Sequence, residues 1–319
     1  MEKDAKIYVA GHRGLVGSAL CRELAAQGYR NVVTADRDRV DLLYPRETEA
    51  FLLTERPRYV FLAAAKVGGI RANATYPGDF IRDNLRIQCN VIHGAWLAEV
   101  RKLLFLGSSC IYPRLCPQPI REEYLMTGAL EETNAPYAIA KIAGITMCQS
   151  YRNQYGLDAI SVMPTNLYGP GDKFDDLDGH VLPALLLRFA HAVATDSPTV
   201  TIWGTGEPRR EFLHVDDLAK ACLLCMHRYS EDAPINIGCG EDHTIMELAR
   251  TIADTVGFKG RICTDPSMPD GTPRKLLDIT KISKLGWKPQ VELSEGIRQI
   301  YNEILHNGVL DNYINKHKS

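Results

Sequence analysis

The first 170 residues alternate short apolar runs with segments of helical periodicity. The apolar runs are KIYVAG (6–11), NVVTAD (31–36), YVFLAAA (59–65), KLLFLGSS (102–109) and DAISVMPTNLYG (158–169). Between them, the spacing of apolar residues predicts helices over 18–28, 47–56, 82–100 and 137–156. Strands that are apolar throughout and alternate with helices indicate a parallel sheet covered on both faces. Right-handed crossovers then predict an α/β fold with a doubly wound parallel sheet of the Rossmann type.

The pattern changes after residue 170. Residues 169–180 are rich in Gly and Asp and predict a loop. We therefore expect a dinucleotide-binding domain over 1–170 and mainly a second, smaller α/β substrate-binding domain over 171–319. Apolar patterns within 211–240 are typical of the first domain, so we expect that segment to return to it.

Composition narrows the class of protein. The chain has 319 residues, 45% hydrophobic and 24% charged, with a net charge of −2 and no basic block. These values are typical of a globular protein and favour neither nucleic acid nor a membrane as a partner. No run approaches the length of a membrane span, and the N-terminus lacks a signal-peptide core. We expect a cytoplasmic location.

The nine cysteines are scattered and odd in number, which is typical of reduced thiols. Cys222 and Cys225 form a C-x-x-C motif, but no second Cys/His pair lies at zinc-finger spacing. We expect these two thiols to pack within a helix, and we expect no metal site.

A glycine-rich turn follows the first predicted strand and opens the first predicted helix. Gly11, Gly14 and Gly17 are spaced G-x-x-G-x-x-G. Glycines in this context let the backbone approach a dinucleotide pyrophosphate, whose charge the helix N-terminus stabilises. The residues of this expected phosphate loop are Gly11, His12, Arg13, Gly14, Leu15, Val16 and Gly17.

Three charged residues bear on the choice between NAD and NADP. Asp36 ends the second predicted strand, where an acid would hold the ribose 2′-hydroxyl of NAD. Arg13 and Arg37 lie beside that position, and two guanidinium groups suit a 2′-phosphate. The pair of arginines favours NADP.

A possible catalytic set combines Ser108 with Tyr137 and Lys141. The spacing Y-x-x-x-K places the last two on one face of a helix, which Pro136 helps to start. A nearby ammonium should lower the tyrosine pKa from about 10, so that the phenol exchanges a proton with a carbonyl. Ser108 could hydrogen-bond the same oxygen. The alternative for the pair is an exposed helix face.

Several longer stretches carry a resemblance that extends almost from end to end. They are GHRGLVGSA, AAAKVGGI (63–70), FLGSSCIYP (105–113), PYAIAKIAGI (136–145), VMPTNLYGP (162–170), REFLHVDDLA (210–219) and PDGTPRKLLD (269–278). The chain resembles extended short-chain dehydrogenase/reductases, and most specifically the GDP-L-fucose synthase family. That resemblance implies NADPH-dependent 3,5-epimerisation and 4-reduction of GDP-4-keto-6-deoxy-D-mannose. A 4-epimerase or 4,6-dehydratase of the same fold is the alternative, and a sensor that has lost catalysis is a third.

The implied chemistry requires two acid/base groups besides Tyr137. A 4-keto group acidifies the hydrogens at C3 and C5, and each inversion takes a proton from one face and returns it on the other. Cys110 and His180 are the candidates, and the resemblance assigns them these roles. Their alternatives are a buried thiol and a loop or helix-cap histidine.

The resemblance also implies binding residues. Besides the phosphate loop and Lys141, the cofactor set comprises Arg37, Asp38, Arg39, Val40, Asp41, Leu42, Leu106, Gly107, Ser108, Ser109, Pro164, Thr165, Asn166, Leu167 and His180. The substrate set is Arg188, Trp203, Arg210 and Asp270, whose alternatives are helix surface, strand core and a turn. Extended members are often homodimers through paired helices, and the helices over 82–100 and 137–156 could form that face or lie in the core.

Overall fold

The computed structural model describes residues 1–174, 179–268 and 270–316. Its main sheet is formed by β1 (Ile7–Ala10), β2 (Val32–Val33), β3 (Tyr59–Leu62), β4 (Lys102–Leu106), β5 (Asp158–Pro164) and β10 (Ile235–Ile237). The strand order is β10-β5-β4-β3-β1-β2, and each neighbouring pair is parallel. The predicted doubly wound fold is confirmed. The order reverses between β1 and β3, where ligands of such sheets bind.

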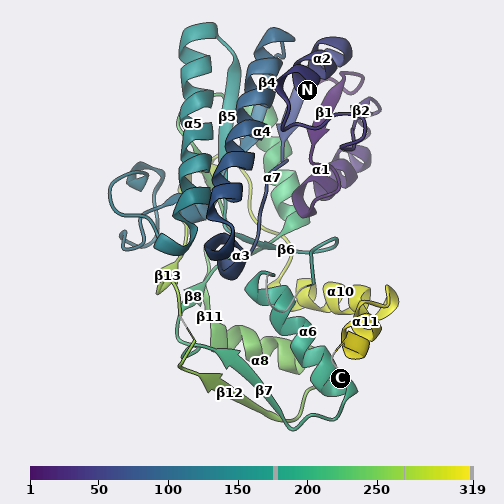
Figure 1. Ribbon diagram of the computed structural model, residues 1–319, viewed down its shortest axis with the longest axis vertical. Helices are drawn as coiled ribbons and strands as arrows, with labels where there is room; N and C mark the ends of the chain where they lie inside the picture. The colour runs from purple at the N-terminus through teal and green to yellow at the C-terminus, as the bar shows by residue number, and fades with distance from the viewer. Residues whose placement is uncertain (175–178, 269, 317–319) are drawn as a thin grey trace.

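Helices cover both faces of this sheet (Figure 1). α1 (Leu15–Ala26) and α7 (Val215–Arg228) share one buried core with alternate strand residues such as Ile7 and Val9. The opposite core contains Tyr8 and Ala10. It lies beneath α2 (Pro45–Glu55), α4 (Pro77–Leu97) and α5 (Ala135–Tyr155). The alternation follows from the two-residue period of a strand, and burial on both faces explains why these strands are apolar throughout.

The segment 158–169, predicted as a single strand, forms two. β5 ends at Pro164, which has no N–H to continue the hydrogen-bond ladder. The chain then leaves the main sheet, and β6 (Asn166–Tyr168) pairs with β9 (Phe212–His214). This break places residues 164–167 at the carboxyl edge of the sheet, between the two lobes of the molecule (Figure 1).

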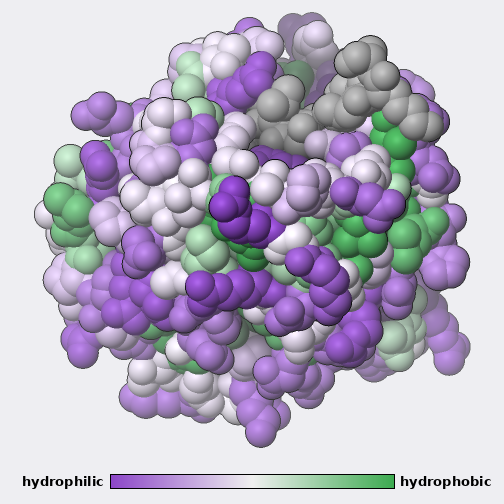
Figure 2. Space-filling view, turned by 90° about the horizontal axis from the view of Figure 1, so that it is seen from below, coloured by the Kyte–Doolittle hydropathy of each residue, from purple (hydrophilic) through white to green (hydrophobic). Residues whose placement is uncertain are grey.

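The second lobe has its own apolar core. β7 (Thr199–Trp203) and β12 (Arg261–Asp265) form a parallel pair. The core is made by helices α6 (Val181–Ala194), α8 (Ile245–Val256), α10 (Leu293–His306) and α11 (Val309–Lys316). Figure 2 shows this lobe from below, where hydrophilic side chains cover most of the surface and hydrophobic ones gather in small groups. Such small groups are ordinary for a globular surface.

Short elements connect the lobes. β8 (Arg209–Arg210) pairs with β11 (His243–Thr244) on one side and with β13 (Arg274–Lys275) on the other. The remaining helices are α3 (Ile70–Thr75), α9 (Thr280–Lys284) and the 3₁₀ turns η1 (Ser109–Ile111), η2 (Glu122–Tyr124) and η3 (Glu132–Asn134). α7 and β10 belong to the layers of the main sheet. The division of the chain into domains, with a boundary near residue 171 and a return within 211–240, stays a prediction.

The two cysteines of the C-x-x-C motif lie on α7. Cys222 and Cys225 lie fully buried on α7 within the core of the main sheet, which confirms that they pack a helix. Burial raises the pKa of both thiols. Among the helices of the described ranges, none is long and apolar enough to cross a membrane.

Candidate active site

The turn after β4 places a serine and a cysteine side by side. Ser108 has extended backbone and caps η1, so that the backbone N–H of Cys110 donates to Ser108 Oγ at 3.3 Å. Ser108 Oγ and Cys110 Sγ lie 2.8 Å apart. A tight turn at the carboxyl end of a buried strand therefore presents both groups together at the ligand-binding edge of the sheet.

Tyr137 and Lys141 lie in the first two turns of α5, on the face toward this turn. Lys141 Nζ donates to the carbonyl of Leu106 at 2.7 Å and lies 5.9 Å from the centre of the Tyr137 ring. Tyr137 is also hydrogen-bonded to Ser108. The structure thus brings together Ser108, Cys110, Tyr137 and Lys141, four of the five predicted catalytic residues.

The pKa of Tyr137 is shifted in the direction opposite to the one expected from the sequence. Burial raises the pKa of Tyr137, the nearby Cys110 raises it further, and the hydrogen bond with Ser108 opposes this only in part. The Lys141 ammonium is turned toward Leu106, and burial lowers its own pKa to about 8. Desolvation is therefore the largest influence on both groups, and Tyr137 is a neutral phenol suited to donating a proton.

We predict that Lys141→Met removes activity and raises stability. The amine is only 4% exposed, and the shift of its pKa from 10.5 to about 8 is a cost of holding the ammonium in the fold. The unfolded chain binds more protons between those values, so wild-type stability rises with pH across that window. The variant should gain roughly 1–3 kcal/mol at neutral pH. It should also lack the rise, as urea unfolding at several pH values would show. A variant less stable than wild type at neutral pH would contradict this.

The glycine turn after β1 has the shape that a pyrophosphate requires. Gly11 has φ +85°, and a Cβ there would lie 2.7 Å from the backbone of Ala64. A Cβ at Gly17 would lie 2.1 Å from the carbonyl oxygen of Gly11. α1 then begins at Leu15, with its N-terminus at the reversal of strand order. Side chains are thus excluded where a dinucleotide would approach the backbone, and the site fits that cofactor.

The residues beyond β2, which are predicted to bind the adenosine end of the cofactor, lie close to the glycine turn. Arg13 pairs with Asp36 at 2.5 Å, and His12 Nε2 lies 3.4 Å from the same carboxylate. The carboxylate is thus held by the phosphate loop. Arg37 is exposed nearby, whereas Arg39 donates to the carbonyl of Thr34 at 3.3 Å. Of the other predicted residues, Asp38 is exposed, Val40 is buried, and Asp41 and Leu42 are half-buried.

The other predicted cofactor residues lie at two neighbouring strand ends. Leu106–Ser109 end β4, and Pro164–Leu167 end β5 and begin β6. Gly107 N donates to the carbonyl of Val162 at 2.8 Å, which ties the two ends together. These residues lie at the carboxyl edge of the sheet, where folds of this type bind their ligands. Their position agrees with a cofactor-binding role, which stays a prediction.

His180 stands apart from the other catalytic candidates. It is exposed and precedes α6 as its N-cap. Partial desolvation and the positive charge of Lys275 lower its pKa. Within the part of the chain that the structure describes, His180 forms no hydrogen bond with Ser108, Cys110 or Tyr137. Its acid/base role stays a prediction.

The predicted substrate residues form two pairs. The guanidinium of Arg188 lies 5.2 Å from the centre of the Trp203 ring, which is 40% exposed and so is not strand core. Arg210 donates to the backbone carbonyl of Asp270 at 3.5 Å. The Asp270 carboxylate accepts from the backbone and hydroxyl of Thr205 at 2.8 and 2.9 Å. The Asp270 carboxylate therefore holds the chain at Thr205, and the substrate-binding role of all four residues stays a prediction.

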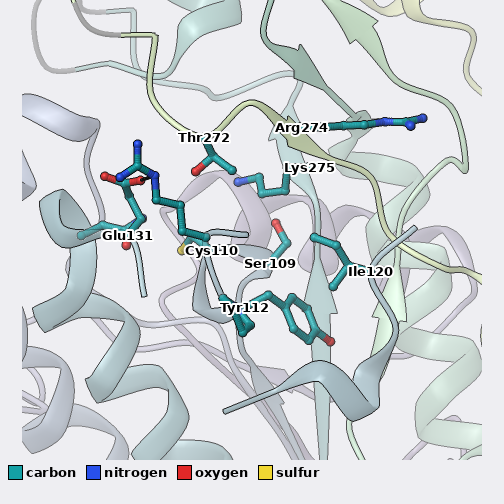
Figure 3. A pocket seen from close by; sticks show the side chains of 11 residues that line it. Ser109, Cys110, Tyr112, Ile120, Glu131, Thr272, Arg274 and Lys275 are labelled. Atoms are coloured by element: carbon teal, nitrogen blue, oxygen red, sulfur yellow. Dashed lines mark ion pairs between the residues drawn. The ribbon is translucent and has the colours of Figure 1, made fainter. Parts of the chain in front are cut away.

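A pocket of about 40 Å³ adjoins Cys110 and contains a residue to which the sequence assigned no role (Figure 3). Lys275, on β13, points into it from the side opposite η1, next to Thr272. Arg114 and Glu131 form an ion pair at the rim, at 3.0 Å. The only sequence signal was a lysine within PDGTPRKLLD, because a short strand far along the chain has no periodicity that points to Cys110.

Comparison with known proteins places this geometry in a family. Residues 7–238 match the family described as "NAD dependent epimerase/dehydratase family". The chain belongs to the NAD dependent epimerase/dehydratase family. Within this epimerase/dehydratase family it is 56% identical to "GDP-L-fucose synthase 1" of Arabidopsis thaliana over 306 residues, covering 96% of this chain and 95% of that one. It is 53% identical to "GDP-L-fucose synthase" of Escherichia coli over 311 residues, covering 95% and 97%.

A solved structure extends the likeness to three dimensions. It is a GDP-L-fucose synthetase from Naegleria fowleri bound to NADP, with a TM-score of 0.88 and 27% identity, covering 96% of each chain. The resemblance drawn from the motifs is confirmed. This chain combines the doubly wound parallel sheet with a tyrosine and a lysine beside the carboxyl edge of that sheet.

Proposed function

We propose that this protein converts GDP-4-keto-6-deoxy-D-mannose to GDP-L-fucose by epimerisation at C3 and C5 followed by reduction at C4. The observation that carries the proposal is the Cys110 thiol, 2.8 Å from Ser108 and beside Tyr137. A plain 4-reductase requires only the serine, tyrosine and lysine. A thiol at the same edge supplies the acid/base group that carbon inversion needs, and relatives more than 50% identical carry this activity in their names.

The epimerisation half of the reaction uses the ketone at C4. Removing a proton from C3 or C5 places negative charge on the C4 oxygen. Ser108 and the neutral phenol of Tyr137 both donate hydrogen bonds suited to that oxygen. Cys110 takes the proton as thiolate, and His180 returns one on the opposite face of the ring. Each inversion then leaves the substrate with its ketone restored.

The reduction half ends the sequence. NADPH, when bound on the glycine turn, supplies the hydride equivalent for C4. Tyr137 donates its proton to the C4 oxygen, so that a ketone becomes an alcohol. Lys141, whose Nζ donates to the carbonyl of Leu106 at 2.7 Å, would hold the nicotinamide ribose when the cofactor is bound. Arg188 and Arg210 are suited to the diphosphate, and Trp203 offers an exposed aromatic face.

Cofactor consumption distinguishes this function from its alternative. A 4-epimerase or 4,6-dehydratase returns the hydride to its own substrate and consumes no external NADPH. The proposal expects one NADPH oxidised for each keto sugar converted, followed as loss of NADPH absorbance. Conversion of the sugar without NADPH loss would favour the alternative.

We further propose a cytoplasmic homodimer. All nine cysteines are free thiols, which suits a reducing compartment. Aromatic rings cluster on α4 and α5, with Trp96 and Tyr155 at 4.5 Å and Tyr151 and Tyr155 at 5.0 Å between centres. Tyr155 is 42% exposed, and two copies of this face can pair about a twofold axis.

The dimer proposal predicts a particle of twice 35.6 kDa in solution. Light scattering after size exclusion would measure this mass for the wild type. Tyr155→Asp should shift it to the monomer because a charge would be buried at the proposed interface. A monomeric wild type would contradict the dimer without bearing on the catalytic proposal.

A further inference from the structure

Glu211 is a fully buried carboxylate that the mechanism does not use. Its side chain has 0% exposure and lies between β8 and β9. One carboxylate oxygen accepts the backbone N–H of Gly240 at 2.7 Å, and the other accepts that of Leu277 at 3.0 Å. A buried carboxylate is costly unless it is fully hydrogen-bonded, so this one is retained at a position where it joins separate segments.

The segments that Glu211 joins are those that build the candidate site. Leu277 lies two residues after Lys275, and Gly240 follows β10 of the main sheet. The backbone carbonyl of Glu211 accepts from Thr165 Oγ1 at 3.2 Å and Asn166 Nδ2 at 2.8 Å, at the predicted nicotinamide end. A single residue next to Arg210 thus connects the cofactor edge with the strand that carries Lys275.

The neighbouring backbone leaves room for this carboxylate. A Cβ at Gly238 would lie 2.2 Å from one Glu211 oxygen and 2.8 Å from the other. Glycine at 238 therefore leaves room for the carboxylate, because any larger residue would collide with it. The hydrogen bonds that Glu211 accepts from Gly240 and Leu277 depend on this space.

Lys275 brings a positive charge to the pocket of Cys110. Both residues line that pocket, and Figure 3 shows the amine directed into it. Burial lowers the pKa of the Lys275 amine, and the neighbouring Cys110 opposes that shift. The amine forms no hydrogen bond or ion pair with the residues that the structure describes. A cation beside a cysteine stabilises the thiolate, the form that can accept a proton from carbon.

We propose that Glu211 is a positioning residue for the epimerisation steps, which places the Lys275 ammonium at the pocket that Cys110 lines. It acts by fixing the backbone just after Lys275. This inference rests on the proposed function, because only an enzyme that inverts C3 and C5 needs Cys110 as a base.

The test is a double-mutant cycle read out by exchange of the C3 and C5 hydrogens with solvent deuterium. Lys275→Met should lower the exchange rate about 30-fold, because the thiolate loses its cation. Glu211→Gln should lower it about tenfold, since an amide cannot accept both backbone N–H groups. The double variant should fall no further than about 30-fold, because one residue acts through the other. A purely structural role predicts independent effects, about 300-fold together.

Glu122→Gln is the matched control. Glu122 is also a buried carboxylate, and it accepts the backbone N–H of Asn236 at 3.0 Å. Its replacement should lower the melting temperature to a similar extent, and its effect on exchange should simply add to that of Lys275→Met.

Three results are decisive. Additive effects of Glu211→Gln and Lys275→Met would overturn the proposal. So would normal exchange in Lys275→Met alone, a measurement that stands even if Glu211→Gln does not fold. A wild-type enzyme that exchanges neither hydrogen would instead reject the proposed function.

Discussion

Cys110→Ser is expected to abolish exchange of the C3 and C5 hydrogens with solvent, by about a thousandfold or more. A serine hydroxyl is far less acidic than a thiol, so at neutral pH it offers almost no conjugate base. The substitution keeps the size and the contact with Ser108, whose oxygen lies 2.8 Å from the sulfur. Deuterium incorporation into the keto sugar, followed by NMR with NADP⁺ in place of NADPH, measures this step without reduction.

The control for this variant is another thiol of the chain. Cys116 lies six residues later in the same loop, and burial raises its pKa. Cys116→Ser should exchange deuterium at the wild-type rate. Both variants should bind NADPH normally, since neither residue belongs to the glycine turn. Exchange at a normal rate in Cys110→Ser would show that another group removes the carbon-bound protons.

Tyr137→Phe is expected to lower the rate of C4 reduction by about a thousandfold. Burial raises the pKa of this phenol, so it is protonated across the neutral range and is the acid for the C4 oxygen. Phenylalanine keeps the ring that packs edge-on against Phe80 at 6.4 Å and removes only the hydroxyl. Single-turnover oxidation of NADPH with saturating keto sugar measures the loss.

Ser108→Ala provides the comparison for Tyr137→Phe. It removes a hydrogen bond to the C4 oxygen but leaves the acid that protonates this oxygen. The rate of C4 reduction should therefore fall by about tenfold to a hundredfold. Equal losses in the two variants would show that the hydroxyl of Tyr137 is one hydrogen bond among several rather than the acid.

Much of the main sheet could be predicted from the sequence because its strands are buried on both faces. Continuous apolar runs such as YVFLAAA leave few alternatives, and Gly28 and Gly156 mark the ends of two of the helices between them. The break at Pro164 was missed because Leu167 and Tyr168 resume a strand-like pattern directly after the polar Thr165 and Asn166. The hydrophobic pattern indicates which residues are buried. It does not show that the strand leaves the main sheet after Pro164, which depends on the missing N–H of that proline.

The candidate site could be predicted in part. Two of the catalytic candidates, Ser108 and Cys110, come directly after a predicted strand. The other two, Tyr137 and Lys141, lie at the start of a predicted helix. Their proximity could therefore be expected from the order of the predicted elements. Lys275 and Glu211 could not be found this way, because the hydrogen bond from the backbone N–H of Leu277 to the Glu211 carboxylate joins segments 66 residues apart. The direction of the Tyr137 pKa shift was also predicted wrongly, because the prediction considered the nearby charge of Lys141 but not the burial of the phenol.

The most direct test of the central claim is the NMR spectrum of the product formed in D₂O from GDP-4-keto-6-deoxy-D-mannose and NADPH. The account predicts GDP-L-fucose that carries deuterium at C3 and C5 and protium at C4. It also predicts that product formation equals NADPH consumed. A reduced sugar that keeps protium and the original configuration at C3 and C5 would contradict it, because the enzyme would then be a plain 4-reductase.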